Sequence, residues 1–263
     1  MQKNNPGQLN LCSASGMMFF LKVTMLRTIL WYSCFWLLQL LSPPFLLGYF
    51  LLGLLGRKEA QAKFLDLTTR TWARLLIIIA GGRVDVSGLE NLPVGGGMLF
   101  VSNHQGAFDI PLLLGYVPGL KGFVSKKENS RLPIVGTWMK LLHCIFIDRK
   151  DLRQSAHAIA RGVGDLQAGR SLIVFPEGTR SKSGVMKRFK DGSFKLATRS
   201  GAVIVPLTID GSYRLLEGNR GRITPGKVHL HIHPPIKIQD LSAAGKSTLT
   251  ETVQRIIASK LPV

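Results

Sequence analysis

Short apolar segments recur through the later two thirds of the chain and alternate with longer amphipathic segments. The short segments have the length and the β-branched or aromatic content of strands. They are RVDVSG (83–88), MLFVS (98–102), KGFVS (121–125), CIFI (144–147), SLIVF (171–175), AVIVPLTI (202–209) and KVHLHIH (227–233). Helical stretches are predicted at 57–79, 110–117, 133–142, 151–167, 192–200 and 246–261. This alternation predicts an α/β domain with a mixed, largely parallel sheet flanked by helices.

The N-terminal part of the chain has a different pattern. No charged residue occurs from Thr28 to Gly56, a stretch long enough for a transmembrane helix. Pro43 and Pro44 stand near its middle, where a proline pair disfavours a continuous helix. Because basic residues flank both ends, we expect a membrane-associated helical hairpin with its ends on one side of the bilayer. A single span and a buried, soluble hairpin are the alternatives.

These patterns divide the chain into three parts. Residues 1–27 form a polar lead-in, of which we expect the first sixteen to be disordered; residues 28–56 form the hairpin, and residues 57–263 the α/β domain. A domain of this size buries a substantial core without disulfides. The three cysteines lie far apart and show no paired spacing, which favours a reducing compartment; they are Cys12, Cys34 and Cys144.

The charge balance points to an anionic partner. The chain has 34 Lys and Arg against 15 Asp and Glu, a net charge of +19. Such an excess fits nucleic acid, an anionic membrane surface or a phosphorylated substrate. Since 46% of the residues are hydrophobic, the membrane surface fits better. We expect no nucleic-acid partner, because no recognised binding motif is present. A basic binding protein without catalytic activity is the non-enzyme alternative.

The segment NHQGAFD (103–109) carries the first candidate chemistry. It follows the predicted strand at 98–102, and Gly106 permits a sharp turn before a helix that begins near Asp109. His104 and Asp109 are five positions apart, so their side chains would point away from each other in a helix and lie on opposite faces in a strand. A strand–turn–helix corner is therefore needed to bring the two side chains together. Asp109 could instead only cap the helix.

Two further segments place polar residues at strand ends, where α/β sheets usually bind ligands. FPEGTRSKSG (175–184) suits a type I turn with Pro176 second and Gly178 fourth. It carries Glu177, Thr179 and Arg180, and a guanidinium can grip a phosphate bidentately. SKKEN (125–129) and FIDRK (146–150) add Lys126 and Arg149, among other cations. Together they suggest a funnel for anions.

With these residues, the chain resembles the glycerolipid acyltransferase family that includes 1-acyl-glycerol-3-phosphate acyltransferases. NHQGAFD is similar to the family's first motif, KKEN with FIDR to its second, FPEGTRS to its third and VIVPL (203–207) to its fourth, over about residues 83–210. Four motifs in order are a specific signal. One position departs from the pattern: Gly106 stands where many members carry Ser.

The resemblance implies transfer of a fatty acyl group from a thioester, acyl-CoA or acyl carrier protein, to a lipid acceptor's hydroxyl, giving phosphatidic acid from 1-acyl-sn-glycerol-3-phosphate. His104 would be the general base and Asp109 would orient it. Arg180 and Lys126 would hold the phosphate, and Glu177 would bond the glycerol or brace the loop. We expect no metal or bound cofactor, and a site on the cytoplasmic face of the cell membrane. The oxyanion donors could be backbone N–H groups around Gly178.

Alternatives within the same chemistry stay open. Glycerol-3-phosphate or a lyso-aminolipid could be the acceptor instead. Outside it, the histidines of HLHIH (229–233) would share a strand face and could ligate zinc, although no cysteine or acidic partner lies close in sequence; they are His229, His231 and His233.

Overall fold

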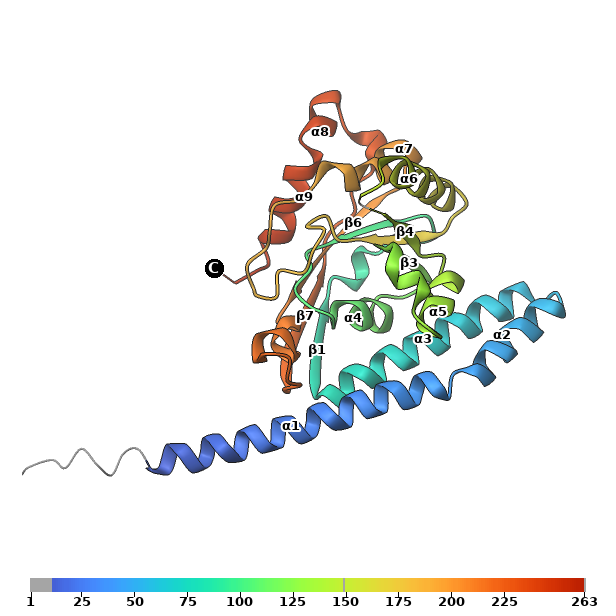
Figure 1. Ribbon diagram of the computed structural model, residues 1–263. Helices are drawn as coiled ribbons and strands as arrows, with labels where there is room; N and C mark the ends of the chain where they lie inside the picture. The colour runs from blue at the N-terminus through green and yellow to red at the C-terminus, as the bar shows by residue number, and fades with distance from the viewer. Residues whose placement is uncertain (1–10, 149, 263) are drawn as a thin grey trace, which may run out of the picture.

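The structure is a computed structural model that describes residues 11–148 and 150–262; the side chains of residues 11–21 and 152 are not described. Its helices are α1 (Leu11–Leu40), α2 (Pro43–Leu54), α3 (Lys58–Ala80), α4 (Asp109–Tyr116), α5 (Val135–Leu141), α6 (Leu152–Gln167), α7 (Lys195–Ser200), α8 (Ala243–Ser247) and α9 (Leu249–Ala258). Its strands are β1 (Gly82–Ser87), β2 (Leu99–Ser102), β3 (Lys121–Lys126), β4 (Ile145–Ile147), β5 (Ser171–Val174), β6 (Ile204–Asp210) and β7 (Gly226–Ile232). Figure 1 shows helices on both sides of the sheet.

The seven strands form one sheet in the order β1-β7-β6-β2-β5-β3-β4. Only the β6–β7 pair is antiparallel, so the predicted mixed, largely parallel sheet is confirmed. Strand β2 lies at the centre between β5 and β6. Since β2, β3, β4, β5 and β6 run parallel, the segments that follow them emerge at one edge of the sheet. The motif residues that follow β2, β3 and β5 therefore share that edge.

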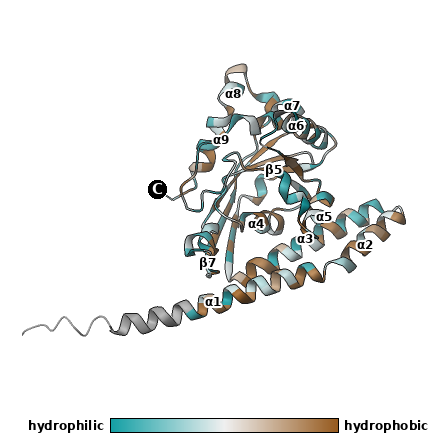
Figure 2. Cartoon of the chain, in the orientation of Figure 1, coloured by the Kyte–Doolittle hydropathy of each residue, from teal (hydrophilic) through white to brown (hydrophobic). Residues whose placement is uncertain are grey.

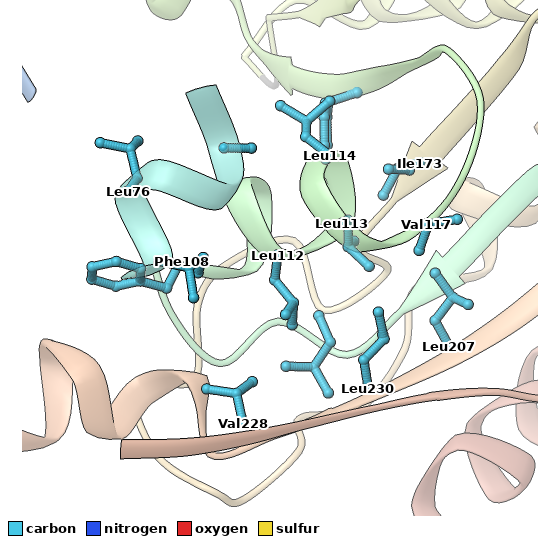
Figure 3. Packing of buried hydrophobic residues seen from close by; sticks show 14 of the residues in the cluster. Leu76, Phe108, Leu112, Leu113, Leu114, Val117, Ile173, Leu207, Val228 and Leu230 are labelled. Carbon is cyan, nitrogen blue, oxygen red and sulfur yellow. The ribbon is translucent and has the colours of Figure 1, made fainter. Parts of the chain in front are cut away.

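Two apolar cores cover the two faces of the sheet. On one face, α3 and α4 pack on the strands, as Figure 3 shows for Leu76, Phe108, Leu112, Leu113, Ile173, Leu207 and Val228. On the other face, α6, α7 and α9 contribute Leu166, Leu196, Val253 and Ile257. Strands β2 and β5 are buried along their whole length, which matches their unbroken apolar runs.

The chain bends between α1 and α2 but does not turn back there. Helix α1 ends at Leu40, and Pro43 occupies the first turn of α2, where a missing N–H is tolerated. The predicted break at the proline pair is confirmed, but a hairpin folded at that point is wrong. Helix α1 also begins at Leu11, so the expected disorder over the first sixteen residues is wrong from that position on; residues 1–10 lie outside the described part.

The reversal occurs between α2 and α3 instead. Gln61 Nε2 of α3 donates to the carbonyl oxygen of Tyr49 in α2 over 3.0 Å. Further along α3, the carbonyl oxygen of Leu76 accepts from Trp31 Nε1 of α1 over 2.9 Å. Helix α3 thus runs antiparallel to α2 and then to α1, which follow each other in one direction (Figure 1). The hairpin consists of α1 and α2 on one arm and α3 on the other.

Helix α1 is fastened to the α/β domain on one side and exposes apolar side chains on the other. Trp31 is buried, and its ring lies 5.2 Å from that of Phe108, next to Asp109. The helical stretch Lys22–Leu54 is long and apolar enough to cross a membrane. Most of it is not buried, and the colouring of α1 and α2 in Figure 2 shows how many of its residues are hydrophobic. The predicted boundary at residue 56 falls in the turn before α3, yet the two parts share one core.

Candidate active site

The corner after β2 brings His104 and Asp109 together. Nδ1 of His104 lies 2.7 Å from Oδ2 of Asp109. The same carboxylate oxygen accepts from the backbone N–H of Gly106 over 3.0 Å. Because a carboxylate only accepts, Nδ1 carries the proton in this pair and Nε2 is left as the basic nitrogen. The side chain of Asp109 is 0% exposed, whereas that of His104 is 17% exposed. Asp109 is therefore closed to solvent, and part of the imidazole can be reached by a substrate.

Ser212 completes the environment of Asp109. Its hydroxyl donates to Oδ1 of Asp109, and the side chain is fully buried. Ser212 begins η4 (Ser212–Leu215), directly after β6. Both carboxylate oxygens of Asp109 are thus hydrogen-bonded, which fixes the direction of the imidazole. Nothing in the sequence near Ser212 marked this role, because the contact joins residues 103 positions apart.

Two residues of the third motif support the imidazole from the other side. The ring of Phe175 stacks on His104 at 4.0 Å with an angle of 16° between the planes. Glu177 is buried and accepts from the backbone N–H groups of His104, over 2.7 Å, and of Lys187, over 3.0 Å. Burial raises the pKa of Glu177 above its usual range. Of the two roles expected for Glu177, the structure shows bracing of the loops.

Arg180 is anchored to the catalytic corner by Glu217, the first residue of η5 (Glu217–Asn219). Nη1 of Arg180 donates to Oε1 of Glu217 over 2.9 Å, and the N–H of Ala107 donates to the same oxygen over 2.8 Å. The Glu217 side chain is only 8% exposed, and its Oε2 has no hydrogen-bond partner among the described residues. Nε and Nη2 of Arg180 make no other hydrogen bond in the described part, so this edge of the guanidinium can accept a ligand.

The other predicted binding residues lie nearby with different roles. Gly178 closes the expected turn, because its N–H donates to the carbonyl oxygen of Phe175 over 3.0 Å. That N–H is therefore engaged, while the use of other backbone N–H groups around Gly178 as oxyanion donors stays a prediction. Thr179 is exposed and its hydroxyl accepts from Lys187 Nζ over 3.3 Å. Sequence reasoning did not single out Lys187, which also donates to the carbonyl oxygen of Arg180.

Lys126 is not joined to this cluster by any described contact. Lys126 is exposed at the end of β3, and β5 separates β3 from β2. Two strand spacings correspond to roughly 10 Å, so a ligand that reaches His104, after β2, would have to extend toward β3 to touch Lys126. Arg149 lies outside the described residues.

The three histidines near the end of β7 do not converge as a zinc site. His229 faces Asp85, His231 bonds Ser87, and Nε2 of His233 lies 2.8 Å from the hydroxyl of Thr208. Burial lowers the pKa of His233 to about 4. Within the described residues, no group of three His, Cys, Asp or Glu side chains could hold a metal ion.

A His–Asp dyad at the carboxyl edge of a largely parallel α/β sheet is an arrangement that can remove a proton from a substrate group. The family profile described as Acyltransferase matches residues 83–210. The chain belongs to this acyltransferase family.

Individual relatives agree with this assignment. A protein of Borreliella burgdorferi named 1-acyl-sn-glycerol-3-phosphate acyltransferase is 31% identical over 73% of this chain and 77% of its own length. The chloroplastic protein LPAT1 of Arabidopsis thaliana is 33% identical over 73% of this chain, but the match spans only 55% of that protein. The crystal structure of the lysophosphatidic acid acyltransferase PlsC from Thermotoga maritima superimposes with a TM-score of 0.80 and 30% identity, covering 90% of this chain and 93% of the other.

Proposed function

We propose that this protein transfers a fatty acyl group from an acyl thioester to the sn-2 hydroxyl of 1-acyl-sn-glycerol-3-phosphate, producing phosphatidic acid. The observation that carries the proposal is the placement of Arg180 beside the His104–Asp109 corner, joined through Glu217. A phosphate held by the open edge of the guanidinium would position the acceptor hydroxyl near the imidazole. The names of the relatives and the family assignment support the same reaction.

The chemistry follows from the free nitrogen of the imidazole. Nε2 of His104 removes the proton of the acceptor hydroxyl while its oxygen attacks the thioester carbonyl carbon. Asp109 stabilises the imidazolium that forms. When the tetrahedral intermediate collapses, the carbon–sulfur bond breaks and the imidazolium returns the proton to the leaving thiolate. The products are the ester and a free thiol, of CoA or of acyl carrier protein, and the scheme uses no resident metal or cofactor.

The exposed apolar side of α1 and α2 would hold the enzyme on the membrane that contains its lipid substrates. Its side chains include Leu26, Ile29, Trp36, Leu40 and Leu54. Because α1 and α2 lie along α3, and α3 packs on α4 of the domain, they would rest in the interface with one side in lipid. We place the active site on the cytoplasmic face, where acyl thioesters are available, and the net charge of +19 favours anionic lipid there.

One observation favours a second acceptor class. The carboxylate of Glu217 lies beside Arg180 at the proposed phosphate site, and its negative charge would attract an ammonium group. A lyso-aminolipid is therefore the alternative acceptor.

The test is thiol release by the purified full-length protein with acyl-CoA. The acceptors are lysophosphatidic acid, the monoacylglycerol that lacks its phosphate, a lyso-aminolipid and glycerol-3-phosphate. We expect lysophosphatidic acid to react fastest. Equal rates with the phosphorylated and dephosphorylated acceptors would rule out phosphate recognition, and a faster lyso-aminolipid would establish the alternative.

A further inference from the structure

A cavity of about 310 Å³ lies at the edge of the sheet opposite to the catalytic corner. Its lining includes Lys121 and Ser171, the first residues of β3 and β5. His104, in contrast, follows the last residue of β2. Helices α2 and α3 form one wall, and the end of α5 forms another. Parallel strands carry their amino and carboxyl ends on opposite edges, so this cavity is separate from the site described above.

All ionisable side chains that line the cavity, apart from the phenol of Tyr49, are basic; they are Lys58, Lys121, His143 and Arg170. No carboxylate lines it in the described part of the chain, although Asp165 pairs with Arg170 at 2.8 Å behind the wall. Such a concentration of cations in a partly enclosed space attracts anions, because the low-dielectric walls strengthen the field.

Lys121 places a buried amine in the lining of this space. Its side chain is 2% exposed, and its ammonium donates to the carbonyl oxygens of Val117, over 2.7 Å, and Gly119, over 2.5 Å. An ammonium group has three N–H donors, so one remains for a ligand. Burial lowers the pKa of Lys121 to about 7, although the carboxylate of Asp66 raises it by a smaller amount.

His143 adds an imidazole, a hydrogen-bonding group, held in a costly conformation. Its φ of 56° lies in the left-handed region, which non-glycine residues rarely adopt. Burial and the nearby guanidinium of Arg170 lower the pKa of His143. An anion placed between His143 and Arg170 would raise the pKa of His143 and so oppose the effects of burial and of the guanidinium.

Apart from Gln61, Ser171 and two glycines, the remaining lining is apolar and includes residues of α2 and α3. It includes Ala62, Leu65, Leu120, Leu141 and Leu142, with Tyr49 contributed by α2. A space lined by both basic and apolar side chains matches an amphiphile with an anionic head group. We propose that this cavity binds the phosphate head group of an anionic membrane phospholipid, at a site separate from the active site. The proposal does not depend on the reaction that the enzyme catalyses.

The experiment measures lipid retention by the full-length protein in detergent, using native mass spectrometry. The probes are short-chain phosphatidylglycerol, short-chain phosphatidylcholine and inorganic phosphate. The test variant is Lys58→Ala/Arg170→Ala, and the matched control is Lys237→Ala/Lys246→Ala, which removes the same charge from exposed positions elsewhere. A third protein, Arg180→Ala, reports on binding in the catalytic region.

We expect phosphatidylglycerol to bind at least about tenfold less tightly to the test variant, because two charge-assisted contacts are lost. Its binding should stay unchanged in the control and in Arg180→Ala. If Arg170→Ala unfolds the protein, Lys58→Ala alone with Lys246→Ala as control gives the same comparison. Equal retention of the two lipids, equal losses in test and control variants, or inorganic phosphate binding as tightly as phosphatidylglycerol would each overturn the proposal.

Discussion

Glu217 and Gly106 fit against each other at the edge of the catalytic corner: a Cβ atom on Gly106 would lie 2.5 Å from Oε2 of Glu217. A real Cβ does not approach an oxygen so closely, so the carboxylate keeps its place only because position 106 is glycine. This explains the departure from the serine found in many family members. The space that a larger residue would fill here holds the acid that anchors Arg180.

Glu217→Ala tests the anchoring of Arg180. Without the carboxylate, the guanidinium loses its fixed direction, so we expect the KM for lysophosphatidic acid to rise about tenfold and kcat to fall as well. Rates with monoacylglycerol should change little, since this acceptor offers no phosphate. Steady-state kinetics with both acceptors measure the difference, and the exposed acid Glu251→Ala is the control. Equal losses with both acceptors would mean that Glu217 only supports the fold.

Arg180→Ala and its combination with Glu217→Ala show whether the two side chains act together. If Glu217 works by orienting Arg180, its removal should add little once Arg180 is absent. Losses that multiply would instead show two independent roles.

Gly106→Ser should reproduce the Glu217→Ala defect, because the new side chain pushes the carboxylate out of its place. The double variant Gly106→Ser/Glu217→Ala should be no worse than either single variant, since the clash has been removed. Kinetics with lysophosphatidic acid and a thermal unfolding curve for each variant check this. A double variant that loses the product of both single effects would contradict the steric explanation.

His104→Ala should lower the rate of thiol release by about 10²–10⁴-fold while the protein stays folded. Asp109→Asn should also be severe, because it disturbs the tautomer of the imidazole. Ser212→Ala removes one hydrogen bond to Asp109 and should cost about tenfold in kcat, with a shifted pH–rate profile. Circular dichroism controls for folding. Near-full activity of folded His104→Ala would show that another residue is the base.

The sequence sufficed for elements whose signals are local. Each of the strands was marked by its own apolar run. The parallel direction of β2 and β5 was predictable from the helical segments that lie between them in the sequence. The corner was predictable because His104, Gly106 and Asp109 lie within six residues. Ser212 and Glu217 were not, since they reach the corner from loops more than a hundred residues later and no periodic pattern marks them.

The N-terminal helices show a second limit. The prolines at 43 and 44 indicated where a helix must break, but not by how much the chain changes direction. That direction is decided by packing on α3, through contacts such as the one between Trp31 and Leu76. Arg180 illustrates the same limit at the site. The sequence predicted that its guanidinium could bind phosphate, but its pairing with Glu217 depends on the tertiary fold.

Replacing exposed apolar residues of α1 and α2 tests membrane binding. Leu26 and Leu40 are 69% and 70% exposed, and Leu26→Lys/Leu40→Lys should weaken liposome binding at least tenfold, because each buried leucine contributes about 1.5–3 kcal/mol. Val185→Lys, at an exposed loop position of the α/β domain, is the control. Co-flotation with anionic vesicles is the measurement. Undiminished flotation of the double variant would show that another surface binds the membrane.

The buried ammonium of Lys121 predicts a specific pH dependence of stability. Burial lowers its pKa from 10.5 to about 7, while Asp66 raises it and Arg70 lowers it by smaller amounts. Between pH 7 and 10.5 the unfolded chain therefore binds a proton that the folded protein does not, so the free energy of unfolding should rise with pH across this window. The slope contributed by one group is at most about 1.4 kcal/mol per pH unit, and below pH 7 it vanishes because both states are protonated. In Lys121→Met this contribution should disappear, whereas the exposed control Lys237→Met should keep it. Urea unfolding at a series of pH values, in detergent without added phospholipid, measures the slope. Parallel pH profiles for Lys121→Met and the unmodified protein would mean that Lys121 stays protonated in the fold.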